Sequence, residues 1–360
     1  MENLSIKGFK CFSNTTVKFN NLTVLVGANG YGKSSTIQAL LLLKQAMDNS
    51  SNILLNGIYG LELGTVSDIV NQNTPLSTIE VGFKDEDNDK TLVNCVLDIQ
   101  DKIEDLVVDY TLKKESFCRW FSVLQFYYIS AEREGPRTSQ KLFPMEFLHC
   151  GTRGEYTAQV LGTNAGMTKI DTSRMYPNSK NPYLNFQVNE WLSFMFPGVK
   201  VSANVDTKLL RAAVRVSNQY AVNDVQSTNM GFGVSYVLPI IVDGLVAEKG
   251  STFIVENPEA HLHPAAQTSI GWFIAMIAYS GVNVIVETHS DHVIDGIQLF
   301  GLSNKEWLSS VLINNYGLKD GMPLVTPISF DENGDYSEWP EGFMDQTQIN
   351  YMKKLKIQKQ

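Results

Sequence analysis

One complete phosphate-binding loop constrains this chain more than any other feature of its sequence. Residues 27–34 match the pattern G-x-x-x-x-G-K-[ST] at every position. The apolar run 22–26 before the loop predicts a strand, and the leucine-rich run 37–43 after it predicts a buried helix. Such a loop wraps its backbone N–H groups around phosphate oxygens, and the helix N-terminus adds partial positive charge. Both flanking elements argue against an ordinary glycine-rich turn, so we expect a nucleoside triphosphate site in an α/β fold.

Two side chains of the loop have specific predicted roles at a bound triphosphate. Lys33 would reach the β- and γ-phosphates, and the hydroxyl of Ser34 would ligate Mg²⁺. The loop residues expected to bind the nucleotide are Asn29, Gly30, Tyr31, Gly32, Lys33, Ser34 and Ser35.

The apolar run 253–256 ends in a carboxylate, which is the pattern of the metal-binding half of such a site. Glu256 is predicted to bind Mg²⁺ through water. In isolation, a core strand with a surface glutamate at its end would be the preferred interpretation. The phosphate loop elsewhere in the chain favours the metal-binding role.

Four of the five histidines form two pairs, and each pair follows a predicted core strand: His261 with His263, and His289 with His292. P-loop ATPases place γ-phosphate sensors at such strand ends, so His289 is predicted to contact the γ-phosphate or the attacking water. A transition-metal site is the alternative, because H-x-H and H-x-x-H can supply ligands, although no cysteine lies near. For His263 and His292 we favour a simpler role, either capping a helix or contacting a neighbouring subunit.

A third segment could bind phosphate from a second subunit. Gly231 and Gly233 open a predicted helix over 234–247, and Ser235 lies in its first turn. The N-terminus of a helix binds anions, so a phosphate held in trans would fit there. Glycine before a helix is common, however, and the segment alone carries little weight.

Charge and composition exclude several classes of protein. The 360 residues are 43% hydrophobic and 19% charged, which excludes intrinsic disorder and fibrous folds. A net charge of −9 excludes a globally basic nucleic-acid-binding surface. Residues 131–215 have a local charge of about +4, which fits DNA and a solvated surface equally well. The arginines of that stretch are Arg133, Arg137, Arg153, Arg174, Arg211 and Arg215.

An uncharged run over residues 265–286 is long enough to cross a bilayer. Its periodicity changes at Ser280–Gly281, from helical spacing to a β-branched run, so a buried helix, a turn and a core strand explain it better. No export signal is visible at the N-terminus, and we expect a cytoplasmic protein without a membrane partner. Four separated cysteines without a CxxC pair fit reduced thiols: Cys11, Cys95, Cys118 and Cys150.

Together these motifs resemble the ABC-type ATPases of the SMC/RecF/OLD group. Residues 7–12 resemble the N-terminal strand of that group, and 27–35 resemble its phosphate loop. Residues 256–264 are similar to the Walker B motif and D-loop of the OLD-like branch, and 287–290 to the switch region. Residues 231–235 lie where the group has its ABC signature. Two further segments, 129–137 and 339–343, look like segments shared by a subgroup of small bacterial ATPases.

The chain departs from this group in three respects. The usual Asp-Glu pair is replaced by Glu256 and Asn257, and an amide cannot act as a general base, so Glu259 is the substitute candidate and slow hydrolysis is expected. No long heptad insertion separates Ser35 from Gly231, which excludes an SMC-like coiled-coil arm. OLD nucleases carry roughly two hundred further residues as a Toprim domain. Because no such domain follows here, any nuclease is expected in a partner.

The resemblance implies an α/β P-loop NTPase with an ABC-ATPase-like core, an antiparallel β arm and an inserted irregular or helical region. The expected divisions are a core part with the phosphate loop over 1–70, the arm over 71–125, the inserted region over 126–225, a core part with signature, Walker B and switch over 226–330, and a tail over 331–360. Within the arm, alternation predicts antiparallel strands over 77–114. Asn333–Gly334 is the hairpin signal of the tail.

The resemblance also implies ATP and Mg²⁺ as cofactors and a homodimer or higher oligomer. Two ATP molecules would lie between the phosphate loop of one subunit and Gly231, Gly233 and Ser235 of the other. Hydrolysis, with Glu256, Glu259 and His289 as catalytic residues, would gate a separately encoded, nuclease-like effector in bacterial anti-phage defence or DNA maintenance. Two alternatives remain open: an ATP-dependent scaffold with negligible hydrolysis, and the nucleotide-binding subunit of an ABC transporter, whose Leu-Ser-Gly-Gly-Gln signature this chain lacks.

Overall fold

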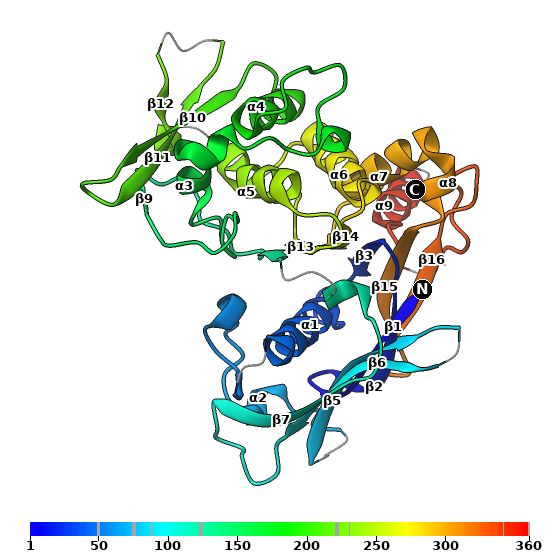
Figure 1. Cartoon of the computed structure of the whole chain (residues 1–360). Coiled ribbons are helices and arrows are strands. Elements are labelled where there is room, and N and C mark those ends of the chain that lie inside the picture. Colours follow the sequence, from blue (N-terminus) through cyan, green and yellow to red (C-terminus); the bar gives the residue numbers. More distant parts are fainter. Residues whose placement is uncertain are drawn as a thin grey trace. The chain divides into compact units, whose positions relative to one another are not determined.

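The computed structural model describes residues 1–48, 51–73, 77–87, 89–121, 125–219, 223–229, 231–340 and 342–358. The chain divides into two compact units, and each is assembled from separate stretches of sequence (Figure 1). The first unit comprises Met1–Cys118, His289–Asp291 and Leu308–Gln360, and the second comprises Arg119–Thr288 and His292–Trp307. The five divisions expected from the sequence stay a prediction.

The first unit contains an antiparallel sheet and the long helix α1. The sheet has the strand order β2-β1-β5-β6-β7-β4, so the antiparallel strands expected over 77–114 continue the sheet that begins at the N-terminus. Helix α1 packs against strands of this sheet (Figure 1). The elements are β1 (Glu2–Phe9), β2 (Phe12–Phe19), α1 (Lys33–Met47), β4 (Ile53–Leu54), α2 (Val66–Ile69), β5 (Thr78–Asp85), β6 (Thr91–Asp98) and β7 (Val107–Lys114).

The strand that carries the phosphate loop, β3 (Leu22–Gly27), pairs in parallel with β15 (Val311–Lys319), and β15 pairs antiparallel with β16 (Met322–Ser329). The turn of this β15–β16 hairpin is Asp320–Gly321, where both residues have positive φ. The sequence signal at Asn333–Gly334 marks a different turn, which is closed by the bridge between Phe330 and Tyr336. Both dipeptides have sequences that favour a tight turn. The sequence therefore does not show which of the two turns joins the longer pair of strands. The exposed helix α9 (Gln346–Gln358) follows and carries the predicted C-terminal lysines except Lys359, which lies outside the described residues.

The second unit contains a parallel sheet covered by helices. Its strands have the order β14-β13-β8, and α4, α5 and α6 pack against one another (Figure 1). The elements are β8 (Phe126–Ile129), α4 (Leu184–Met195), α5 (Phe232–Val246), β13 (Thr252–Glu256), α6 (Pro264–Tyr279), β14 (Asn283–Glu287), α7 (Asp291–Ser303) and α8 (Lys305–Leu308). The fully buried Trp191 of α4 contacts the rings of Trp272 and Phe273 on α6.

The stretch that the sequence left irregular forms a small sheet of its own within the second unit. Strands β10 and β11 pair antiparallel, and short segments β9 and β12 add to β11. These elements are β9 (Gln140–Lys141), α3 (Thr157–Gly162), β10 (Lys200–Asp206), β11 (Arg211–Ser217) and β12 (Val225–Gln226).

The uncharged run over 265–286 forms α6, a turn and β14, as its change of period predicts. No described helix is both long enough and apolar enough to cross a membrane. All four cysteines are free thiols.

Helix α5 carries a fully buried carboxyl group at Asp243. Its Oδ1 accepts a hydrogen bond from the backbone N–H of Cys150 at 2.7 Å, whereas Oδ2 has no partner among the residues described. Burial raises the pKa of Asp243 to about 8. The usual pKa of Asp in an unfolded chain is about 3.9. At pH values between these two pKa values, the folded protein therefore keeps a proton on Asp243 that the unfolded chain releases.

We expect this proton to make stability fall as pH rises towards 8. Between about pH 4 and 8 the free energy of unfolding should decrease by up to about 1.4 kcal/mol per pH unit through Asp243. Asp243→Asn keeps the acceptor for Cys150 and should remove this component. Urea unfolding at pH 6, 7 and 8 measures it, with the exposed Asp101→Asn as control. Equal slopes in wild type and Asp243→Asn would contradict the assignment.

Candidate functional site

The phosphate loop joins β3 to α1 within the first unit. The structure shows why glycine is needed at several of its positions. Gly30 and Gly32 have φ of +82° and +109°, in the left-handed region that favours glycine. A Cβ on Gly32 would overlap the ring of Phe12, whereas no atom lies within 4 Å of a Cβ placed on Gly30. Gly27 lies so close to the backbone of Tyr316 on β15 that a side chain would overlap its carbonyl oxygen. The loop is therefore fixed at its base and open at its centre.

Lys33 lies under the loop rather than in solvent. Its side chain is 3% exposed, and Nζ donates hydrogen bonds to the carbonyl oxygens of Gly27 and Ala28, both at 2.9 Å. Ser34 is exposed, and the first turn of α1 contains no acidic residue, so the helix N-terminus keeps its positive field. This combination of left-handed glycines, a buried ammonium group and an acid-free helix N-terminus fits a triphosphate.

His289 lies beside the loop, although 254 or more residues separate it from the loop in the sequence. Val26, Gly27, Ala28 and His289 line one pocket of about 420 Å³ within the first unit. The structure thus brings the predicted sensor histidine to the beginning of the phosphate loop. The other residues that line this pocket are Asn315 of β15 and the segment Gly342, Phe343, Met344, Asp345, Gln346 and Ile349.

This C-terminal wall of the pocket is a feature that the sequence did not reveal. Phe343 is buried, and its ring packs against Tyr336 and Trp339 with centroid distances of 5.3 and 5.2 Å. The carboxylate of Asp345 accepts a hydrogen bond from the N–H of Gly342 at 3.1 Å. The segment around residues 339–343 had only a family resemblance and no predicted role. Its Glu341 lies outside the described residues.

Glu256 ends strand β13 in the second unit and is held on both oxygens. Oε1 accepts from the hydroxyl of Tyr128 at 3.1 Å, and Oε2 accepts from the N–H of Ala131 at 3.0 Å. Burial raises the pKa of Glu256, and these two hydrogen bonds together with the charge of Arg133 oppose that rise. Each carboxylate oxygen retains a second lone pair, so the group fits the water-mediated contact to Mg²⁺ that the sequence predicts.

A second carboxylate ends the neighbouring strand. Glu287 of β14 lies directly opposite Glu256 in the parallel register, and both side chains are buried. Sequence reasoning missed Glu287 as a site carboxylate. The signal was available, because both strands are apolar runs that end in glutamate and the carboxyl ends of parallel strands share one edge of a sheet.

Asn257 and Glu259 follow β13 in a tight turn. Asn257 has φ of +43°, a left-handed conformation that asparagine tolerates better than most residues. Glu259 Oε2 accepts a hydrogen bond from Thr288 Oγ1 at 2.8 Å, and Oε1 lies 3.5 Å from the side-chain nitrogen of Asn257. The carboxylate proposed as the substitute base is therefore oriented by the residue that follows β14.

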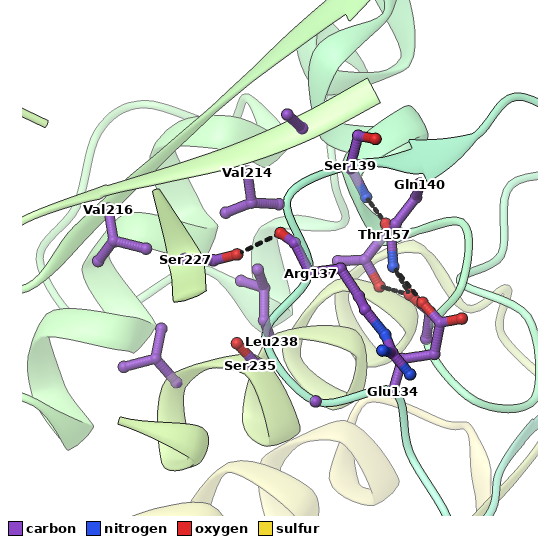
Figure 2. A pocket seen from close by; sticks show the side chains of 15 residues that line it. Glu134, Arg137, Ser139, Gln140, Thr157, Val214, Val216, Ser227, Ser235 and Leu238 are labelled. Carbon is purple, nitrogen blue, oxygen red and sulfur yellow. Dashed lines mark hydrogen bonds between the residues drawn. The ribbon is translucent and has the colours of Figure 1, made fainter. Parts of the chain in front are cut away.

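The predicted signature segment forms the start of α5. Gly231 is its N-cap and is exposed, with no atom within 4 Å of a Cβ placed on it. Gly233 is glycine for a packing reason, because a Cβ there would lie 2.9 Å from the carbonyl oxygen of His261. Ser235 lines a small cavity of about 40 Å³ with Leu238, Val214 and other residues (Figure 2). Met230, before the helix, lies outside the described residues.

The remaining histidines have structural partners. His263 is the N-cap of α6, where its Nδ1 accepts from the N–H of Ala265 at 3.4 Å, which confirms the capping interpretation. His261 packs against Phe232 and Tyr236, with ring centroids 5.2 and 4.6 Å away. His292 Nδ1 lies 3.7 Å from an oxygen of Asp295. In the part of the chain that the structure describes, no three His, Cys, Asp or Glu side chains are grouped to hold a metal ion.

The expected basic surface over 131–215 is reduced by burial. Arg133 and Arg174 are only 3% and 2% exposed. Arg174 donates to Ser280 Oγ at 2.7 Å and to the carbonyl of Ala247, at the end of α5. Arg153 pairs with Glu132 at 2.8 Å. The interpretation of these six arginines as a DNA-facing or solvated surface is therefore wrong for Arg133 and Arg174, because the sequence did not indicate which arginines fold inward.

These features define the fold of an ABC-type P-loop ATPase. The chain belongs to the AAA_15 family, described as an AAA ATPase domain, whose model matches residues 1–194 and 168–294. No curated protein matches the chain.

Solved structures of SMC heads share the fold. An SMC head bound to the C-winged helix domain of ScpA is 14% identical, with a TM-score of 0.56 over 91% of this chain and 97% of that one. The SMC head with an extended coiled coil from Pyrococcus furiosus, bound to the C-terminal domain of ScpA, is 13% identical, with a TM-score of 0.52 over 99% and 100%. The SMC head with coiled coil and joint from Pyrococcus yayanosii is 10% identical, with a TM-score of 0.54 over 93% and 98%.

Proposed function

We propose that this chain binds Mg²⁺–ATP, hydrolyses it slowly, and uses ATP-dependent head-to-tail dimerisation to gate a separately encoded, nuclease-like effector in a bacterial defence or DNA-maintenance system. The observation that carries the ATPase part is the shared pocket of His289 and the phosphate loop above the buried Lys33. The gating part rests on the resemblance to the SMC/RecF/OLD group, whose OLD-like branch couples ATPases to nucleases.

Each proposed site residue has a distinct task. The N–H groups of residues 29–35 and the ammonium group of Lys33 bind the phosphates, and Ser34 and Glu256 hold Mg²⁺. The metal ion, when bound, withdraws charge from the terminal phosphate. Glu259, oriented by Thr288 at 2.8 Å, accepts the proton of the attacking water, and His289 hydrogen-bonds the γ-phosphate or that water.

The dimer part of the proposal uses the exposed start of α5. Gly231 and Ser235 would meet the γ-phosphate of ATP held by a second subunit, which closes the dimer only when ATP is present. The acid-free first turn of this helix supports an anion contact. Gly233 would contribute its backbone alone, because the close approach of the His261 carbonyl oxygen already explains why this residue is glycine. Two of the similar SMC heads are bound to domains of ScpA, which supports a protein partner for this fold.

An ATP-dependent scaffold without turnover is the second candidate, and Asn257 favours it. This residue stands where the group carries its general base, and an amide cannot accept the proton. The two functions differ in one measurable quantity, the steady-state rate of phosphate release.

We expect Glu259→Gln to reduce ATP hydrolysis by on the order of 100-fold while ATP binding is kept. The amide preserves the size and the hydrogen bond from Thr288 but cannot take a proton. Phosphate release by the purified chain with Mg²⁺, with and without double-stranded DNA, measures the effect. Glu190→Gln, on α4, is the matched control and should behave as wild type.

Each outcome of this experiment distinguishes the candidates. A Glu259→Gln variant that hydrolyses ATP as fast as wild type would refute the role of Glu259. Tight ATP binding by the wild-type chain with no phosphate release would favour the scaffold function over the ATPase function. Stimulation of hydrolysis by DNA would add DNA to the partners, and the stimulation should weaken steeply with salt.

A further inference from the structure

Arg133 is buried in the second unit and contacts the end of the strand that carries Glu256. It follows β8 closely in the sequence, and its side chain is 3% exposed. Nη1 donates to the carbonyl oxygen of Glu256 at 2.7 Å, and Nη2 donates to that of Asn257 at 2.6 Å. The planar guanidinium group thus bridges two consecutive peptide groups at the point where β13 ends.

One face of the same guanidinium contacts helix α5. Its Cζ lies 5.2 Å from the ring centroid of Tyr236, the fifth residue of that helix. The ring of Tyr236 in turn contacts the ring of His261, in the turn that follows Glu259. One side chain therefore joins the N-terminal part of α5 to the backbone that leads from Glu256 to Glu259.

Arg133 is costly to bury, which argues against a role as core filler. Its Nε has no hydrogen-bond partner among the side chains and backbone groups described, and an unsatisfied buried donor lowers stability. Burial also lowers the pKa of Arg133 to about 10, although Glu259, Tyr236 and Glu256 oppose that shift. An apolar side chain of similar length, such as methionine, would avoid these costs.

We propose that Arg133 is a positioning residue for ATP hydrolysis: clamped on Tyr236, it fixes the backbone of Glu256 and Asn257 and thereby places the carboxylate of Glu259 against Thr288. This inference rests on the proposed ATPase function. Asn257 holds its left-handed conformation with its carbonyl oxygen bound to Nη2, and the next hydrogen bonds of the turn, Ala260 N–H to Asn257 O and Leu262 N–H to Glu259 O, depend on it. Displacement of Tyr236 on α5 would reach Glu259 through these bonds.

Tyr236 gives the cleanest test, because it is only half-buried and can be changed without emptying the core. Tyr236→Leu removes the aromatic face, and Tyr236→Phe keeps it. We expect kcat for ATP hydrolysis to fall about 10-fold in Tyr236→Leu and to stay within about 2-fold of wild type in Tyr236→Phe. Arg133→Lys, which keeps the charge and loses the planar fork, should lower kcat further. In every variant the Kd for ATP should stay within about 3-fold, because the phosphate loop is unchanged.

A second readout follows the backbone directly and needs no turnover. Hydrogen exchange of the peptide over residues 256–263 should accelerate in Tyr236→Leu and Arg133→Lys, and should remain at the wild-type rate in Tyr236→Phe. Tyr279→Leu, on α6, is the control, since Tyr279 contacts Phe300 and Trp307 instead. It should change neither kcat nor exchange over 256–263.

The outcomes separate this inference from the function on which it rests. Wild-type kcat and exchange in Tyr236→Leu would overturn the positioning role, even if Arg133→Lys fails to fold. Equal losses in Tyr236→Leu and Tyr236→Phe would also overturn it, because the aromatic face would then be irrelevant. A wild-type chain with no more phosphate release than Lys33→Ala refutes the ATPase function. The exchange measurement would then decide whether Arg133 still holds this turn.

Discussion

Lys33→Ala is expected to leave no measurable ATP binding at concentrations that just saturate the wild-type chain. The ammonium group lies under the phosphate loop, on the carbonyl oxygens of Gly27 and Ala28, and would turn to the phosphates when the nucleotide enters. Loss of charge-assisted hydrogen bonds to a triphosphate should weaken binding by about 100-fold, or roughly 3 kcal/mol. Isothermal titration with ATP and Mg²⁺ measures this change.

A matched lysine in the same unit controls for a general loss of charge. Lys7 on β1 pairs with Glu80 on β5 at 3.0 Å, and Lys7→Ala should leave the affinity for ATP unaltered. Alanine at position 33 also removes the two hydrogen bonds to the loop carbonyls, so thermal unfolding of both variants should accompany the titration. Unchanged turnover of ATP in Lys33→Ala would refute the role given to this residue.

Glu256→Gln is expected to keep ATP binding and to trap a closed dimer. The amide fits the existing partners, because Ala131 N–H can donate to its oxygen while its nitrogen donates to the hydroxyl of Tyr128. The variant should therefore fold, yet it lacks the negative charge needed at Mg²⁺. Hydrolysis should fall by on the order of 100-fold, and sedimentation with ATP should show a stable dimer.

The oligomeric state in solution, with ATP present, tests this prediction. Wild type with ATP should return to monomer as the nucleotide is consumed, and Glu80→Gln, on the surface of the other unit, should follow wild type. A Glu256→Gln chain that stays monomeric with ATP would contradict the closed-dimer model. If the Glu256→Gln variant no longer binds ATP, Glu256 contributes to the affinity for ATP rather than to hydrolysis alone.

The local patterns predicted most of the fold. The phosphate loop was identified because its residues are consecutive and its flanking periodicities are distinct. Capping of a helix was one of the two roles left open for His263, and the structure shows that cap. The antiparallel strands over 77–114 were identified by alternation. The sheet order was not identified, because alternation gives a strand its buried face and not its neighbour.

What escaped prediction depends on contacts between distant residues. Arg133 was grouped with surface arginines, since nothing in its neighbourhood indicates that Glu256 and Asn257, 123 and 124 positions away, receive its hydrogen bonds. The sequence did not indicate that Asp345 and Asn315 line the pocket. Residues can lie next to one another in a pocket wall without any periodic pattern in the sequence. The sequence predicts a strand over 310–312 only, yet β15 continues to Lys319 because it is paired on both sides.

The pairing of β3 with β15 has a consequence for the order in which the protein is made. The strand that carries the phosphate loop is complete at Gly27, but its partner begins only at Val311, so synthesis must pass through the whole second unit first. A nascent chain has no β15 to hold Gly27 and Tyr316 together and no His289 beside the loop. Such long-range pairing also folds slowly. The nucleotide pocket can therefore form only after the second unit and β15 have been synthesised, and ATP binding marks a chain whose synthesis has passed β15.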